Sequence, residues 1–376
     1  MALKAVQIAG IGIPNVGGQV PENASLCSTR FPQGVEMGRG GGLRPAKFVV
    51  IGHRGNGMNV LQSPDRRMKA FKENSILSFN AAADYLVDFI EFDVQVTKDD
   101  CPVIFHDDFI LSKENDMISE KRITELSLAE FLSYGPQKGS GSGGKPLVRK
   151  TIDGKVVGWC VEIDDALCTL QEALEKVNPS LGFNIELKFD DYLDYEEEEL
   201  LRVLRRVLQV VRDHGKDRPI LFSTFQPDAA LLVKKLQSAY PVLFLTNGGT
   251  EVYSDVRRNS LEEAVKLCVE GGLEGVVSEV KGVFMNPGAV KKMKESNLSL
   301  FTYGKLNNVA EAVYIQHLMG IDGVIVDFVQ EITQAVGHML KPPSSDSEEE
   351  EQNPQFSPME MSFLMKLIPQ LLIQQH

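Results

Sequence analysis

The feature that most constrains this fold is a regular alternation of short apolar runs with amphipathic stretches between residues 47 and 328. The runs are almost continuously apolar, as strands are when both faces of a parallel sheet are buried. Eight runs are predicted as strands: 47–52, 89–96, 181–188, 220–225, 241–246, 272–280, 298–304 and 322–328. Eight strands interleaved with helices, the first of them over 75–88, predict an α/β fold of the (β/α)8 TIM-type barrel class.

One further apolar run, PVIFHD at 102–107, interrupts the alternation. The preceding turn TKDDCP is too short for a helical crossover, so this run is predicted as the hairpin partner of 89–96. Residues 107–180 are irregular, with helical pieces around 126–133 and 168–177, and are predicted as a small insertion. A doubly wound sheet is the alternative, but no strand precedes a G-x-G-x-x-G or G-x-x-x-x-G-K-[ST] motif.

Both ends of the chain differ in composition from the predicted barrel, which spans 46–340. Residues 1–45 are glycine-rich and acid-poor, which fits an organelle transit peptide or a plain disordered extension equally well. Residues 341–358 form an acidic Pro/Ser-rich stretch that predicts a solvated linker. The apolar segment 359–376 is too short to span a bilayer and favours a docked terminal helix, with a partner-binding helix or an interfacial segment as alternatives.

The net charge and the cysteine content limit which binding partners, disulfides and metal sites the sequence predicts. The net charge of −13 gives no bulk electrostatic reason to bind nucleic acid or an anionic membrane. The 5 cysteines form no C-x-x-C pair, which favours free thiols over a disulfide framework or a zinc site. No apolar run reaches the roughly 18 residues of a transmembrane helix, and nothing indicates an oligomeric state.

Residues able to do chemistry fall at the predicted C-terminal strand ends, where a barrel places its working side chains. The second strand carries Glu91 and Asp93, which are two apart and therefore face the same side. The residues that end the other strands or the hairpin are His53, Arg54, His106, Glu186, Lys188, Ser223, Glu279, Lys305 and Asp327.

Glu91, Asp93 and Glu186 would bring three carboxylates together at one rim. In a low-dielectric pocket they would repel strongly unless a cation lay between them, and oxygen ligands favour Mg²⁺ or Ca²⁺ over zinc. A proton-sharing carboxylate dyad and a glycoside hydrolase remain alternatives. His53 and His106 suit phosphoryl chemistry, in which one imidazole takes a proton and another gives one, while Arg54 and Lys188 hold the phosphate.

Several motifs together resemble the glycerophosphodiester phosphodiesterase family, most closely its plant, plastid-type branch. They are VVIGHRGNG (49–57), KEN (72–74), FIEFDVQVTKDDCPVIFHDD (89–108), FNIELK (183–188), FSTFQPD (222–228) and DGVIVD (322–327), with TYGKLN (302–307) favouring the plant branch. The resemblance covers about 46–335 and implies a barrel with an insertion after the His-Asp motif. It implies hydrolysis of glycerophosphocholine, glycerophosphoethanolamine and similar diesters to sn-glycerol 3-phosphate and an alcohol.

Carried over by position, the resemblance makes His53 and His106 the acid/base pair. Glu91, Asp93 and Glu186 become the ligands of a divalent cation, Mg²⁺ ahead of Ca²⁺. Arg54 and Lys188 then bind the phosphate, and the supporting residues are Glu73, Asn74 and Tyr303. Lys72 stands where the family has proline, which predicts a less rigid loop.

Some choices stay open at this point. The nucleophile is water or the substrate's own glycerol 2-hydroxyl, and the headgroup preference is not indicated. A phospholipase acting on intact lipid and a catalytically silent binding barrel are the alternative functions. The resemblance and the acid-poor start predict a chloroplast or other plastid, with the cytoplasm as the alternative.

Overall fold

Eight parallel strands close into a barrel in this computed structural model, which describes residues 35–37, 43–45, 47–114, 117–136, 144–151 and 153–339. The strands are β3 (Val49–Gly52), β4 (Phe89–Val96), β10 (Gly182–Leu187), β11 (Ile220–Thr224), β12 (Val242–Thr246), β13 (Gly275–Glu279), β14 (Ser299–Tyr303) and β15 (Gly323–Val326). They pair in the order β4-β10-β11-β12-β13-β14-β15-β3, and β3 pairs back with β4. The predicted (β/α)8 barrel is therefore confirmed.

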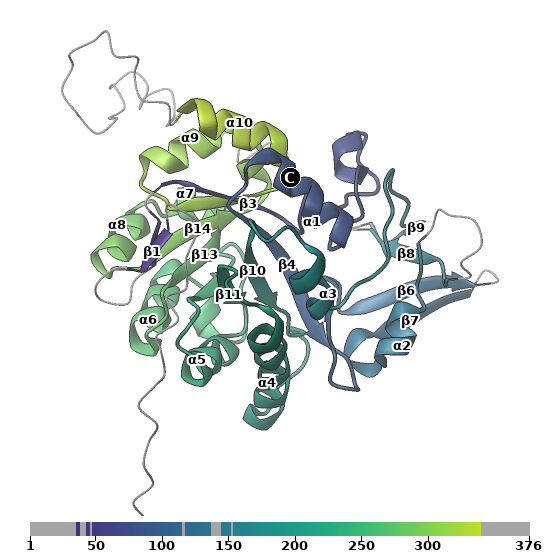
Figure 1. Ribbon diagram of the computed structural model, residues 1–376. Coiled ribbons are helices and arrows are strands. Elements are labelled where there is room, and N and C mark those ends of the chain that lie inside the picture. The colour runs from purple at the N-terminus through teal and green to yellow at the C-terminus, as the bar shows by residue number, and fades with distance from the viewer. Residues whose placement is uncertain are drawn as a thin grey trace, which may run out of the picture.

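Helices surround the barrel (Figure 1). They are α1 (Ile76–Ala82), α3 (Leu170–Lys176), α4 (Glu197–His214), α5 (Pro227–Leu236), α6 (Leu261–Gly271), α7 (Val280–Met285), α8 (Gly288–Glu295), α9 (Ala310–Leu318) and α10 (Val329–Met339). Short 3-10 turns are η1 (Arg66–Lys69), η2 (Ala83–Tyr85), η3 (Ile123–Glu125), η4 (Val256–Arg258) and η5 (Lys305–Asn308). The first helix ends before the predicted residue 88 because Leu86 adopts a left-handed backbone (φ 57) that terminates it, leaving its side chain 90% exposed.

Strand β4 divides its side chains between two layers of the core. Ile90 and Phe92 point outward and join the large apolar cluster between barrel and helices. Phe89 joins the smaller cluster inside the barrel, on the side that also carries Glu91 and Asp93. All eight residues of the strand are buried, so its polar side faces the barrel interior rather than solvent.

The predicted hairpin is present, since β5 (Pro102–Ile104) pairs antiparallel with β4. The following insertion contains an antiparallel sheet beside the barrel (Figure 1), made of β6 (Phe109–Glu114), β7 (Met117–Arg122), β8 (Leu147–Lys150) and β9 (Val156–Gly158), with the short helix α2 (Leu128–Leu132). This part has its own apolar core around Phe105, Phe131 and Trp159. The sheet was not predicted, because β7 is almost wholly exposed and shows no apolar alternation.

Two short strands, β1 (Val35–Met37) and β2 (Leu43–Pro45), pair antiparallel within the stretch 1–45 that was predicted as an extension. The side chain of Leu43 is fully buried and packs with the residues inside the barrel, such as Val49 and Phe301. The predicted linker and apolar segment at 341–376 lie outside the described residues, and the domain limits stay predictions. No helix within the described residues is both long and apolar enough to cross a membrane.

Candidate active site

A pocket of about 330 Å³ opens at the C-terminal ends of the barrel strands. Its lining includes His53, Arg54, Glu91, His106, Glu186 and Lys188. Asp93 lies beneath this lining with only 1% of its surface exposed. The structure therefore brings together all seven residues predicted for acid/base chemistry, cation binding and phosphate binding.

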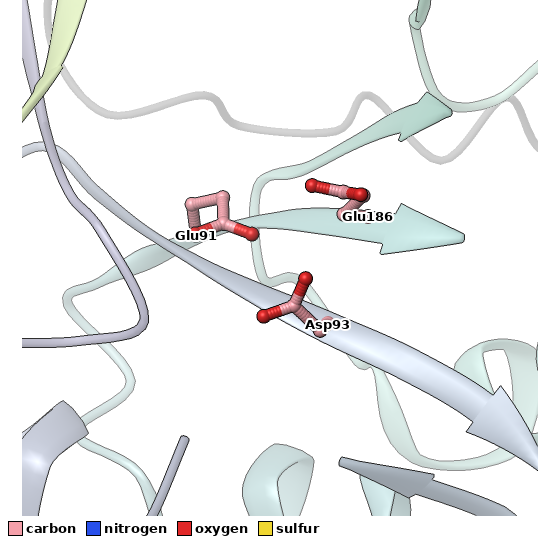
Figure 2. Close-up of side chains that lie close together, drawn as sticks. All are labelled: Glu91, Asp93 and Glu186. Atoms are coloured by element: carbon pink, nitrogen blue, oxygen red, sulfur yellow. The ribbon is translucent and has the colours of Figure 1, made fainter. Parts of the chain in front are cut away.

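The three predicted cation ligands gather on two neighbouring strands. Glu91 and Asp93 come from β4 and Glu186 from β10, where Glu186 is the direct register partner of Asp93. Figure 2 shows the three carboxyl groups on the same side of these strands, and one oxygen from each lies within 4.8 Å of the others. Oxygens bound to one Mg²⁺ or Ca²⁺ at about 2.0–2.6 Å would lie at most about 4–5 Å apart, so the spacing fits such an ion.

The hydrogen bonds of these carboxylates also fit a cation. Glu91 Oε2 accepts from the Arg54 backbone N–H at 3.0 Å, but Glu91 Oε1 is buried and has no hydrogen-bond partner. Burial, followed by the charge of Asp93, raises the pKa of Glu91, and burial raises that of Glu186. A bound divalent cation would give Glu91 Oε1 a partner and offset the repulsion between the carboxylates.

His53, after the first barrel strand β3, is held by the carboxylate of Asp327, which follows the last barrel strand β15. Its Nδ1 lies 2.7 Å from Asp327 Oδ1, and its Nε2 lies 3.9 Å from Glu91 Oε2. Asp327 in turn accepts from the Met58 backbone N–H at 3.0 Å and from Asn308 Nδ2 at 2.8 Å. Burial opposes protonation of His53, but the charge and hydrogen bond of Asp327 prevail and raise the pKa of the imidazole.

His106 is held by its neighbour in sequence. Its Nδ1 lies 2.8 Å from Asp107 Oδ1. Arg149 forms a bidentate ion pair with Asp107, in which Nε and Nη2 donate to the two carboxylate oxygens at 2.9 and 2.7 Å. Burial, then the charges of Arg54 and Lys188, lower the pKa of His106 to about 4. The remaining nitrogen of each imidazole, Nε2, is thus the one available to a substrate.

The two residues predicted to bind the phosphate, Arg54 and Lys188, line this pocket. Lys188 Nζ is 2.9 Å from Glu186 Oε1 and 3.7 Å from Asp93 Oδ1. Arg54 Nη1 donates to Glu73 Oε1 at 2.8 Å, while its buried Nε has no hydrogen-bond partner and lies 3.5 Å from Asp93 Oδ2. Both cations are therefore fixed by carboxylates beside the proposed ion, with donor capacity left over for an anion.

The KEN stretch supports this arrangement. Glu73 accepts from Arg54, and from the backbone N–H of Asn59, while Asn74 Nδ2 donates to Asp93 Oδ2 at 2.8 Å. The expected loosening of the loop at Lys72 is wrong. Lys72 is only 2% exposed, and its backbone N–H donates to the Ile163 carbonyl at 2.9 Å, a hydrogen bond that a proline could not make.

Tyr303 lines the pocket, where its hydroxyl contacts Asn247 Oδ1 and its ring packs edge-on against Phe225 at 6.1 Å. Ser223 and Lys305 also line it, whereas Glu279 is not among the lining residues and caps α7 through the Lys281 backbone N–H at 2.6 Å. Sequence reasoning noted Asp327 as a strand-end carboxylate but gave it no role. Arg149 was missed entirely, because it lies in the irregular insertion where no pattern singled it out.

Two plant proteins match nearly the whole chain. The chain is 61% identical over 374 residues to the protein named glycerophosphodiester phosphodiesterase GDPD1, chloroplastic, of Arabidopsis thaliana, covering 99% of both chains. It is 62% identical over 350 residues to glycerophosphodiester phosphodiesterase GDPD2 of the same plant, covering 90% of this chain and 94% of that one.

A solved structure shares the fold. The phosphodiesterase of Oleispira antarctica, determined in complex with the product sn-glycerol-3-phosphate, superposes with a TM-score of 0.53 at 22% identity, covering 77% of this chain and 96% of that chain. Residues 53–331 match the glycerophosphoryl diester phosphodiesterase family. This match contains every residue of the site described above, and the chain belongs to that family of enzymes.

Proposed function

We propose that the protein hydrolyses glycerophosphodiesters, such as glycerophosphocholine and glycerophosphoethanolamine, to sn-glycerol 3-phosphate and an alcohol. One observation carries this proposal: three carboxylates spaced for a divalent cation, two carboxylate-held histidines and two fixed cations gather at one pocket, with Asp93 beneath its lining. This set matches the needs of phosphodiester cleavage, which are charge neutralisation, an acid and a base. The Arabidopsis proteins named as glycerophosphodiester phosphodiesterases support the choice of substrate class.

The residues would divide the work as follows. Arg54 and Lys188 donate to nonbridging phosphate oxygens and hold the diester in place. Glu91, Asp93 and Glu186 would hold Mg²⁺, or Ca²⁺, which supplies Lewis-acid polarisation of a phosphate oxygen when bound. The supporting residues Glu73 and Asn74 keep Arg54 and Asp93 in position.

The two histidines would handle the protons. One imidazole takes the proton of the nucleophile, water or the glycerol 2-hydroxyl, as its oxygen bonds to phosphorus. The other gives a proton to the oxygen of the departing alcohol as the old P–O bond breaks. Attack by the 2-hydroxyl gives a cyclic phosphate, which water then opens with the proton transfers reversed.

Dialysis against a chelator tests the role of the ion. Turnover of glycerophosphocholine and glycerophosphoethanolamine should vanish after dialysis and return with added Mg²⁺ or Ca²⁺, tested separately. Glu91→Gln should lower the affinity for the ion, measured by calorimetry, while Glu279→Gln, a strand-end carboxylate outside the pocket lining, should not. Full activity after exhaustive chelation would rule out the proposed role of the three carboxylates.

The same assay separates the alternative functions. Phospholipid vesicles offered in place of the soluble diesters should give much slower turnover if soluble glycerophosphodiesters are the substrates. Faster turnover of vesicles would favour a phospholipase. Absence of turnover with either class, with ion present, would favour a silent binding barrel.

We also propose that the protein resides in a chloroplast or other plastid. The support is the name of the Arabidopsis GDPD1 protein, which includes the word chloroplastic, together with the acid-poor start of this chain. Import into isolated chloroplasts tests this location. Retention of a fluorescent fusion of the full chain in the cytoplasm would contradict it.

A further inference from the structure

A second cavity, of about 250 Å³, lies between the barrel and the insertion, next to the active-site pocket. The two cavities share Arg54, Met58 and His106, so they meet where the phosphate would lie. The rest of the second cavity is lined by the loop 59–62 after β3 and by residues 149–151 at the end of β8. We call this second cavity the insertion compartment.

Behind the lining of the insertion compartment, two cationic side chains stack on a single indole ring. Arg149 Cζ lies 4.3 Å and Lys72 Nζ 3.7 Å from the ring centroid of Trp159. The indole Nε1 donates to Asn59 Oδ1 at 2.9 Å, and Arg149 Nη1 donates to the Asn59 carbonyl at 3.3 Å. The loop 59–62 and the insertion are thus joined by hydrogen bonds, so the insertion compartment is formed before any ligand enters.

The charged side chains that line the insertion compartment have one sign. Its lining includes Arg54, Arg149 and Lys150, and among the described residues no carboxylate and no Phe, Tyr or Trp ring lines it, although the imidazole of His106 does. Arg54 and Arg149 are balanced by Glu73 and Asp107 behind the wall. Lys150 is exposed and pairs with no carboxylate of the described residues, which leaves its charge to act on the insertion compartment.

This lining suits some alcohols better than others. A quaternary ammonium group is bound by the faces of Trp, Tyr or Phe rings or by carboxylates, and the described lining offers neither. Guanidinium, ammonium, amide and hydroxyl groups, here from Arg149, Lys150, Gln62 and Thr151, are suited to hydroxyl and anionic groups.

We infer that the insertion compartment receives the headgroup alcohol and selects hydroxyl-rich, uncharged or anionic headgroups over cationic ones. A phosphodiester held between Arg54 and Lys188 has two substituents that leave the phosphorus in different directions. The barrel pocket takes one of them, and the other passes His106 into the insertion compartment. This inference rests on the proposed function and specifies its substrate class.

A comparison of two substrates with different headgroups tests this headgroup selectivity. Glycerophosphoglycerol and glycerophosphocholine differ in headgroup charge and are both soluble, and kcat/KM for each is measured with Mg²⁺ present. We expect a preference of about tenfold or more for the glycerol headgroup. Lys150→Glu should reduce that ratio by about three- to tenfold, chiefly through KM, because reversing an exposed charge changes the interaction only modestly.

Lys155→Glu is the matched control, because Lys155 lies in the same β8–β9 hairpin as Lys150 but is not among the lining residues. It should leave the substrate ratio unchanged. Equal use of both substrates by the natural sequence, or an unchanged ratio in Lys150→Glu, would overturn the inference while leaving the proposed function intact. Failure to hydrolyse any diester would instead overturn the proposed function, and the inference with it.

Discussion

On each side of the active site a carboxylate holds a histidine, but the pKa of His53 is raised whereas that of His106 is lowered. On the barrel side, the donors to Asp327 among the described residues are neutral, namely the Met58 backbone and the Asn308 amide, besides its contact with His53. On the insertion side, Asp107 is neutralised by Arg149, and Arg54 and Lys188 add positive charge near His106. A carboxylate partner therefore fixes the orientation of an imidazole, whereas burial together with the surrounding charges sets the direction of its pKa shift.

Removing either imidazole should have the largest effect. His53→Ala and His106→Ala should each lower kcat by about 10²–10⁴-fold, because each removes one of the two proton transfers. Thermal unfolding should show that both variants remain folded. Near-normal turnover in either folded variant would remove that histidine from the acid/base pair and break the comparison.

Neutralising the carboxylate partners should separate the two sides. Asp327→Asn should lower the pKa of His53 from above to below its usual value, because burial then prevails. Asp107→Asn should leave His106 neutral at pH 7, since its pKa is already lowered to about 4. NMR titration of the imidazoles, without divalent ion, measures both shifts.

The corresponding loss of kcat should be about 10- to 100-fold for Asp327→Asn and smaller for Asp107→Asn. Equal pKa values of His53 and His106 in the natural sequence would contradict the proposed difference between the two sides of the site.

Lys72 offers a test of stability on the insertion side. Its Nζ is buried without a hydrogen bond, and burial lowers its pKa to about 8. The unfolded chain therefore binds the proton more tightly between about pH 8 and 10.5, so the free energy of unfolding should rise with pH in that range. Below pH 8 the full penalty of the buried charge applies.

Lys72→Met should flatten this rise and stabilise the protein at pH 7 by about 1–3 kcal/mol, after the loss of the contact with Trp159. Denaturant unfolding at several pH values measures it. The exposed Lys155→Met is the control, and an unchanged pH slope in Lys72→Met would show that Lys72 has no such penalty.

The smallest effect is expected at Tyr303, which contacts neither histidine. Tyr303→Phe removes the hydroxyl that meets Asn247 and should lower kcat/KM by about two- to fivefold, the cost of about one hydrogen bond. Steady-state kinetics should place the change mainly in KM. A loss as large as that of the histidine variants would give Tyr303 a direct part in the chemistry.

The barrel side of the site could be predicted from sequence far better than the insertion side. A barrel directs strand-end residues to one rim, so Glu91, Asp93 and Glu186 could be placed together from their periodicity. The link between His53 and Asp327 follows from the pairing of the last strand with the first, although the contact itself was not predicted. Arg149 lies on β8 and Trp159 directly follows β9, in an antiparallel sheet whose strands lack a clear pattern, so their position depends on tertiary packing alone.

Leu43 packs at the end of the barrel opposite the active site, and this limits where a protease could cut the chain without destabilising the fold. Leu43 fills the space among the inward-facing residues there, and its carbonyl accepts from the Ser299 hydroxyl. A processing peptidase that removed Leu43 would open a cavity in the core, which costs about 2–5 kcal/mol for a buried leucine. If the proposed plastid location involves a cleaved import signal, the cut should therefore fall before the β1–β2 hairpin, upstream of Val35.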